Sequence, residues 1–118
     1  MTTNEGRYFA NSFDIQWISQ NTDAHLNIVR IKFENLLASF MRLDVPTITA
    51  IHGHAATGGF ILALAPDYRF MKVDRSVLYM SELDHGMKLP SSLLSVLLSR
   101  ILPGALRDVV LGARKFSA

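Results

Sequence analysis

Residues 47–64, TITAIHGHAATGGFILAL, decide the fold of this chain of 118 residues. The stretch begins with a short β-branched segment at 47–51, which is typical of a buried parallel strand. Small residues at 53–59 predict a loop, and the apolar run at 60–65 predicts a buried helix that begins at the end of this loop. The stretch therefore predicts a strand, a glycine loop and a helix in succession.

The flanking sequence adds further strands and helices on both sides of this unit. The predicted elements are a strand at 6–10, a loop at 11–14, a helix at 22–43, strands at 67–73 and 76–80 with a turn at 74–75 between them, and helices at 90–101 and 105–113. Pro103 and Gly104 separate the last two helices. This alternation indicates an α/β fold with a partly parallel sheet, and the length fits a single domain.

The composition excludes several classes of function. The net charge of +2 and the absence of a Lys/Arg cluster argue against nucleic acid as a partner, although a pI near 9.2 would suit a small anionic ligand. With no cysteine, the chain has no disulfide, no thiolate nucleophile and no cysteine-based zinc site. No apolar run reaches the roughly 18 residues of a membrane span. His52 and His54 lack a third ligand at suitable spacing, so no metal site is predicted.

The glycine loop has a physical reason to bind negative charge. The first amides of a helix have no partner within the helix, and the helix dipole is positive at that end. Gly58 and Gly59 would let a ligand approach the backbone closely. The pattern predicts either an anion or oxyanion site or a tight strand–helix connection without a ligand, and it does not match the dinucleotide motif G-x-G-x-x-G.

Three segments in order resemble the crotonase (enoyl-CoA hydratase/isomerase) superfamily: RYFANSFDIQW at 7–17, TITAIHGHAATGGFILALAPDYRFM at 47–71 and SVLYMSELDHGMKLP at 76–90. The third segment is most similar to the plant-type peroxisomal enoyl-CoA delta isomerases. The resemblance implies an α/β crotonase-like (ClpP/crotonase) fold, with a partial ββα-spiral core. It also implies that residues 1–118 form a single partial domain, truncated at both ends relative to the family.

The same resemblance implies the roles of individual residues. The backbone amides of Asn11 and Gly58 would hold the carbonyl oxygen of a thioester substrate. Ser12 and Asp14 belong to the first oxyanion loop, and Ser12 stands where the family usually has glycine, a substitution that would strain the backbone if φ there were positive. Glu82 would be the carboxylate that takes a proton from C2 of a 3-enoyl-CoA and returns it at C4.

The resemblance also separates isomerases from hydratases. Hydratases of the family carry a second glutamate three residues after the oxyanion glycine, and this chain has Ile61 there. The implied function is therefore an enoyl-CoA delta isomerase of fatty acid β-oxidation, without a metal or redox cofactor because CoA enters as part of the substrate. Two alternatives remain open, namely a truncated non-catalytic acyl-CoA-binding or oligomer subunit and a hydratase-type activity.

Partners and compartment follow from the same resemblance. An acyl-CoA substrate is implied, together with a homo-oligomer, since the family forms trimers. The family also implies the peroxisome. The C-terminal residues ARKFSA are not a Ser-Lys-Leu type of peroxisomal address, so the cytoplasm remains an alternative.

Overall fold

The computed structural model describes residues 1–74 and 76–118, and its strands form two sheets. Sheet A holds three strands in the order β1 (Thr2–Thr3), β3 (Ile48–Ile51) and β5 (Tyr68–Met71). Sheet B holds three strands in the order β2 (Tyr8–Ala10), β4 (His54–Ala56) and β6 (Leu78–Tyr79). All pairings between these strands are parallel.

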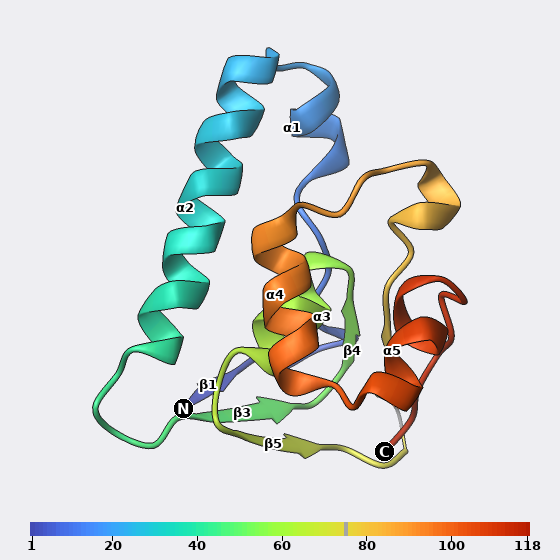
Figure 1. Cartoon of the computed structure of the whole chain (residues 1–118). Coiled ribbons are helices and arrows are strands. Elements are labelled where there is room, and N and C mark those ends of the chain that lie inside the picture. Colours follow the sequence, from blue (N-terminus) through green and yellow to red (C-terminus); the bar gives the residue numbers. More distant parts are fainter. Residues whose placement is uncertain (75) are drawn as a thin grey trace.

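Consecutive strands alternate between the two sheets, and helices follow each pair of strands (Figure 1). The helices are α1 (Ile15–Ser19), α2 (Asp23–Met41), α3 (Gly58–Leu64), α4 (Ser91–Arg100), α5 (Pro103–Val110) and the short 3-10 helix η1 (Leu83–His85). The resulting β-β-α order confirms the spiral arrangement predicted from the sequence. None of the described helices combines the length and the apolar character needed to cross a bilayer.

The core forms around α3, which is apolar on all sides and therefore has no face to present to water. Figure 1 shows α4 in front of α3, with α2 running along one side. The main core cluster joins the helices through Leu37 of α2, Ile61 of α3, Leu97 of α4 and Val109 of α5. Burial of these side chains fixes the beginning of α3, which carries the glycine turn.

The structure corrects the prediction for residues 53–59, because 54–56 form β4 rather than a loop. This strand lies at the centre of sheet B between β2 and β6, where Ala55 is fully buried and small side chains fit. A strand of three residues, His-Ala-Ala, is too short to carry a periodic signal. The strand β1 and the helix α1 were not predicted either.

The other predicted elements are confirmed, most of them with shorter bounds, and α3 begins at Gly58, before the predicted apolar run at 60–65. The final helix begins at Pro103, not after it, because proline is well suited to the first position of a helix. The prediction of a turn at 74–75 includes Arg75, which lies outside the described residues.

Candidate active site

The carboxyl ends of the three strands of sheet B bring together the three segments singled out in the sequence. Asn11 follows β2, Thr57 follows β4, and the segment that contains Glu82 follows β6. The strands are held in register by the pairing of Ala56 with Tyr79 and by the Thr57 N–H, which donates to the Tyr79 carbonyl oxygen at 2.9 Å. Because β4 is the central strand, the glycine turn lies between the other two segments.

The glycine turn is a sharp strand-to-helix junction with an unusual backbone conformation at Thr57. This residue has φ 52° and ψ −119°, a region that residues other than glycine seldom adopt. Its carbonyl oxygen accepts from the N–H groups of Phe60 at 3.0 Å and Ile61 at 3.2 Å, which closes the first turn of α3. Thr57 is only 7% exposed, and its Oγ1 is buried without a hydrogen-bond partner among the described residues.

Two backbone amides at this edge are free to bind a ligand. Neither the Asn11 N–H nor the Gly58 N–H donates a hydrogen bond to any described residue. For Gly58 this is the general condition of the first helical position. A β-carbon built at Gly58 would lie 3.7 Å from the Ser12 Oγ, so the first loop and the glycine turn are in van der Waals reach of each other.

Gly59 has no side chain and so allows the first loop and the glycine turn to pack closely. This role was not predicted from the sequence. A β-carbon at this position would lie 2.7 Å from the Asn11 carbonyl oxygen and closer still to the Ala10 carbonyl oxygen. The backbone of α3 therefore packs directly against the end of β2. The sequence signal was the Gly58–Gly59 pair, but ligand approach was inferred for both glycines, whereas the second glycine is required by packing.

The first oxyanion loop is organised by Asp14. Its carboxylate caps α1 by accepting hydrogen bonds from the N–H groups of Gln16 at 2.9 Å and Trp17 at 3.1 Å. Ser12 does not have a positive φ, since Thr57 and Ala113 are the described non-glycine residues in that region. The replacement of glycine by serine in this loop therefore costs no backbone strain.

A cavity of about 610 Å³ opens beside these segments. Its lining comes from all three segments and from α1, and consists of Asn11, Ser12, Phe13, Asp14, Gln16, Ile18, Ala56, Thr57, Tyr79, Ser81, His85 and Met87. Gly58 and Glu82 are not among the lining residues, but each directly follows one that is. A volume of this size can enclose part of a small organic ligand.

Glu82 combines partial burial with an unpaired oxygen. Its Oε2 is buried and has no hydrogen-bond partner among the described residues. Burial raises the pKa of this carboxyl, while the backbone N–H groups of Glu82 and Ser81 and the charge of His85 act in the opposite direction. A carboxylate with raised proton affinity beside a cavity is suited to take up and return a proton.

His85 lies three residues after Glu82 in the short helix η1 and is exposed, yet it lines the same cavity. The charge of His85 lowers the pKa of the Glu82 carboxyl, against the effect of burial. For metals, the described residues contain no group of three or more His, Asp or Glu side chains that could hold an ion. The chemistry available at this edge is therefore that of backbone donors, a carboxylate and an imidazole.

The chain is similar to several known proteins in sequence and in fold. A family model described as enoyl-CoA hydratase/isomerase matches residues 1–118. The chain is 39% identical over 119 residues to peroxisomal enoyl-CoA delta isomerase 1 of Arabidopsis thaliana, and the match covers 100% of this chain and 49% of that protein. It is 38% identical over 121 residues to enoyl-CoA delta isomerase 3 of the same plant, covering 98% of this chain and 50% of the relative.

Among solved structures, the fold is similar to that of an enoyl-CoA hydratase/isomerase family protein from Hyphomonas neptunium. The TM-score is 0.83 at 26% identity, and the match covers 94% of this chain and 43% of the other. The chain thus has a crotonase-like fold and spans about half the length of the relatives it matches. With a family match along its whole length, the chain belongs to the enoyl-CoA hydratase/isomerase family.

Proposed function

We propose that this chain carries the catalytic centre of an enoyl-CoA delta isomerase, which shifts the double bond of a 3-enoyl-CoA to position 2. The single observation that carries the proposal is the buried, unpaired carboxylate oxygen of Glu82, in the segment that follows β6, the strand paired with β4. The free amides of Gly58 and Asn11 at the same edge supply donors for a developing oxyanion.

The proposed reaction needs one base and two donors. The thioester carbonyl oxygen accepts hydrogen bonds from the Gly58 and Asn11 N–H groups, and Glu82 removes a proton from C2. The electron pair of that C–H bond moves into the thioester, which becomes an enolate. Preorganised donors of this kind lower such a barrier by about 3 kcal/mol each. Glu82 then returns the proton at C4 as the double bond forms between C2 and C3, so the substrate and the product have the same atoms.

Isomerisation is favoured over hydration by the residue at position 61. Hydration by the two-glutamate route needs a second carboxylate three residues after Gly58 to activate water. Ile61 is fully buried in the core and has no group that can bind or polarise water. The identities of the relatives, which are named as delta isomerases, support the same choice.

The compartment and the assembly form a second part of the proposal. One of the relatives is named as peroxisomal, which supports the peroxisome as the compartment. The outer face of α2 exposes Ile28 (50%), Ile31 (48%) and Leu36 (45%), which supports association with further protein surface. The substrate is an acyl-CoA thioester, and neither a metal nor a redox cofactor is required by the proposed chemistry.

The test compares Glu82→Gln with Asp84→Asn, a matched loss of one carboxylate in the same turn where Asp84 is exposed. Supplied with a 3-enoyl-CoA, the unmodified chain and Asp84→Asn should form 2-enoyl-CoA at similar rates. Glu82→Gln should be slower by about 10²-fold or more, the usual contribution of a general base. Equal rates for the two variants would remove Glu82 from the mechanism.

Two further measurements separate the alternatives. Incubation with a 2-enoyl-CoA would yield a 3-hydroxyacyl product if the chain were a hydratase. Calorimetric titration with a saturated acyl-CoA would show binding without any turnover if the chain were a non-catalytic acyl-CoA-binding subunit.

A further inference from the structure

A second cavity, of about 720 Å³, lies at the carboxyl edge of sheet A. Glu5, His52 and Lys72 line it, and they follow the ends of β1, β3 and β5. Gly6, Arg7 and His54 complete the lining from the segments that enter sheet B. In open α/β sheets, ligands bind outside the carboxyl ends of the strands, and this cavity occupies that position on sheet A.

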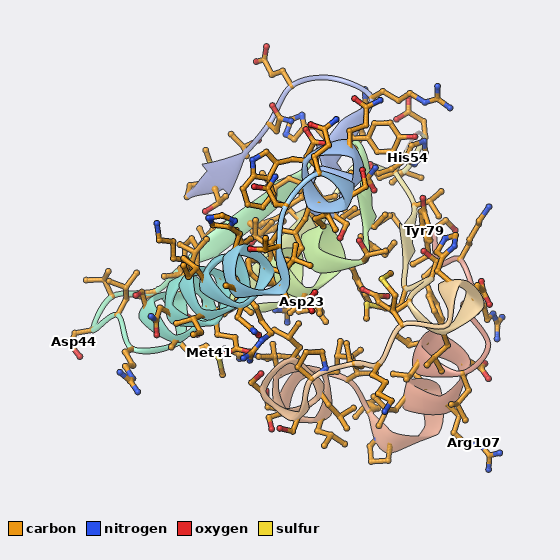
Figure 2. The ribbon with its side chains drawn as sticks, turned by 90° about the horizontal axis from the view of Figure 1, so that it is seen from above. Asp23, Met41, Asp44, His54, Tyr79 and Arg107 are labelled. Carbon is orange, nitrogen blue, oxygen red and sulfur yellow. The ribbon has the colours of Figure 1, made fainter. Side chains whose placement is uncertain are left out.

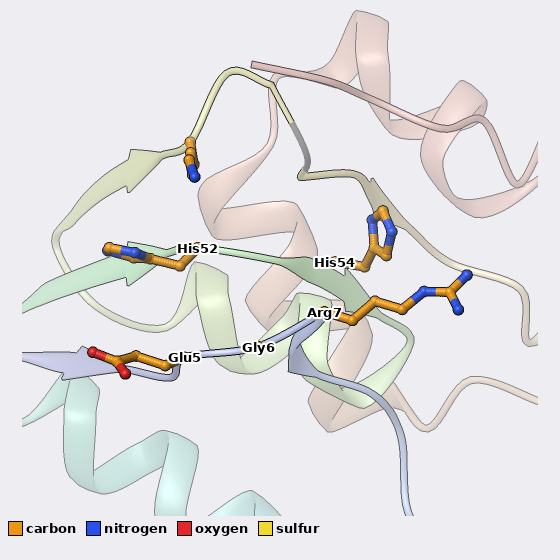
Figure 3. Close-up of a pocket in the computed structure, with 6 residues that line it drawn as sticks. Glu5, Gly6, Arg7, His52 and His54 are labelled. Atoms are coloured by element: carbon orange, nitrogen blue, oxygen red, sulfur yellow. The ribbon is translucent and has the colours of Figure 1, made fainter.

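The lining of this cavity is rich in groups that bind anions. Arg7 and Lys72 are cationic and His52 and His54 contribute imidazoles, against the single carboxylate of Glu5. Figure 3 shows Arg7 and His54 projecting to one side of the cavity, whereas Glu5 and His52 project to the other. The carboxylate is therefore at the end away from Arg7, and an anion bound beside Arg7 and His54 would avoid it.

Among the described residues, Asp74 competes with a bound anion for Lys72. Its Nζ lies 3.7 Å from the Asp74 Oδ1, and both side chains are about half exposed, at 49% and 60%. An ion pair between exposed groups contributes little, so it would not prevent Lys72 from turning toward a bound anion.

The Arg7–His54 end is held in place by backbone and ring contacts. The backbone N–H of His54 donates to the Arg7 carbonyl oxygen at 2.9 Å, and a β-carbon at Gly53 would lie 2.5 Å from the same oxygen. The Tyr8 ring packs edge-on against the His54 ring at 5.4 Å, and the Arg7 guanidinium lies 5.6 Å from the centre of the Tyr8 ring. These contacts restrict the directions in which both side chains can point before any ligand arrives.

His54 also has an unmet requirement for a partner. Its Nδ1 is buried and makes no hydrogen bond to any described residue. Buried polar side-chain atoms nearly always have a partner, so this unpaired nitrogen is an unusual feature of a residue that lines the cavity. A metal is not indicated, because no group of three metal-binding side chains is found among the described residues.

We infer that the cavity lined by Arg7, His54 and Lys72 is a binding site for a phosphate group, as free phosphate or as the phosphomonoester of a small metabolite. The planar guanidinium of Arg7 can donate two parallel hydrogen bonds to such a group, and an ammonium and an imidazole add charge and a further donor. The site shares no lining residue with the proposed active-site cavity. His54 begins β4 and Ala56 ends it, so the two cavities lie at opposite ends of the same strand.

The test is a titration of the ¹⁵N-labelled chain with inorganic phosphate, followed by its amide spectrum, against sodium chloride at equal ionic strength. Phosphate should give saturable shifts at Arg7 and His54 that chloride does not reproduce. Arg7→Gln should weaken phosphate binding about tenfold, which corresponds to about 1.4 kcal/mol for a charge-assisted contact.

The matched control is Arg107→Gln, which removes the same charge from an exposed residue of α5 that lies well away from His54 in Figure 2. This variant should bind phosphate within twofold of the unmodified chain. A second pair, Lys72→Gln and Lys32→Gln, repeats the comparison with exposed lysines in case Arg7→Gln does not fold. Equal affinity within both pairs, or shifts without saturation spread over the whole surface, would overturn the inference.

Discussion

The two sides of the proposed active-site cavity are built in different ways. On one side, the turn at Gly58 and Gly59 joins a central strand to a buried helix, and its backbone packs directly against the end of β2. On the other side, Glu82 precedes a short 3-10 helix, η1, that has no buried residue. The position of the oxyanion donors therefore depends on close backbone packing. The raised pKa of the proposed base depends instead on the burial of its own side chain.

The largest effect is expected from Gly59→Ala, which introduces a methyl group where only backbone fits. The added carbon would collide with the carbonyl oxygens of Ala10 and Asn11. We expect the free energy of unfolding to fall by about 3 kcal/mol or more, because overpacking against backbone cannot be relieved by a side-chain rotation. Urea unfolding followed by circular dichroism measures this loss.

The control for this prediction is Gly104→Ala. Gly104 also lies at the start of a helix, but a β-carbon there would meet nothing within 4 Å. Alanine favours the helix over glycine by up to about 1 kcal/mol, so this variant should be slightly stabilised. If Gly59→Ala were as stable as Gly104→Ala, the close packing of the turn against β2 would be contradicted.

Glu82→Gln should change the free energy of unfolding by an intermediate amount, and it should raise this free energy rather than lower it. Burial raises the pKa of the Glu82 carboxyl in the folded chain, so the folded state holds this proton more tightly than the unfolded state does. The contribution of Glu82 to stability is complete below the unfolded pKa near 4.3 and is lost as pH rises through the raised folded pKa. The charge that remains buried at neutral pH is removed by the substitution.

Glu82→Gln should therefore be more stable than the unmodified chain by about 1 kcal/mol near neutral pH, the order of cost of an unpaired buried polar group. The difference should shrink as pH falls toward about 4, where the unmodified carboxyl is protonated. Thermal unfolding over a pH series measures this, and a difference that grows on acidification would contradict the burial of Glu82. Together with lost turnover, a gain in stability would mark Glu82 as a functional rather than a structural residue.

The smallest effect is expected from Ser12→Gly, which restores the residue usual for the family. Because Ser12 does not have a positive φ, glycine relieves no strain there. Glycine gives the unfolded chain more freedom, so stability should fall by about 0.5 kcal/mol. A clear gain in stability in urea unfolding would show instead that Ser12 is strained.

Most of the fold followed from the sequence because its long elements have clear patterns. The strand at 47–51 is β-branched, and the helix at 22–43 has apolar residues at helical spacing. The strand at 54–56 was missed, since three residues are too few to show a period and their strand conformation depends on pairing with β2 and β6. The helix α1 was missed because its start depends on the Asp14 cap and it has only five residues.

Part of the candidate site could be predicted from the sequence, because its motifs are also clear. The motifs named Asn11, Gly58 and Glu82, and the structure places all three after the strands of one sheet. The packing role of Gly59 and the burial of the Glu82 oxygen could not be predicted, because both depend on the register between strands far apart in the sequence. The roles of these residues in catalysis stay predictions.

The most direct test of the account is to observe both sides of the cavity while a thioester binds. The chain, labelled with ¹⁵N and ¹³C, is titrated with a saturated acyl-CoA that cannot isomerise, and the amides of Asn11 and Gly58 and the side-chain carboxyl carbon of Glu82 are followed by NMR. We expect the two amide protons to move downfield and the Glu82 carboxyl signal to shift with the same dissociation constant. If the thioester bound while the Gly58 amide and the Glu82 carboxyl stayed unchanged, the proposed joint action of the two sides would be contradicted.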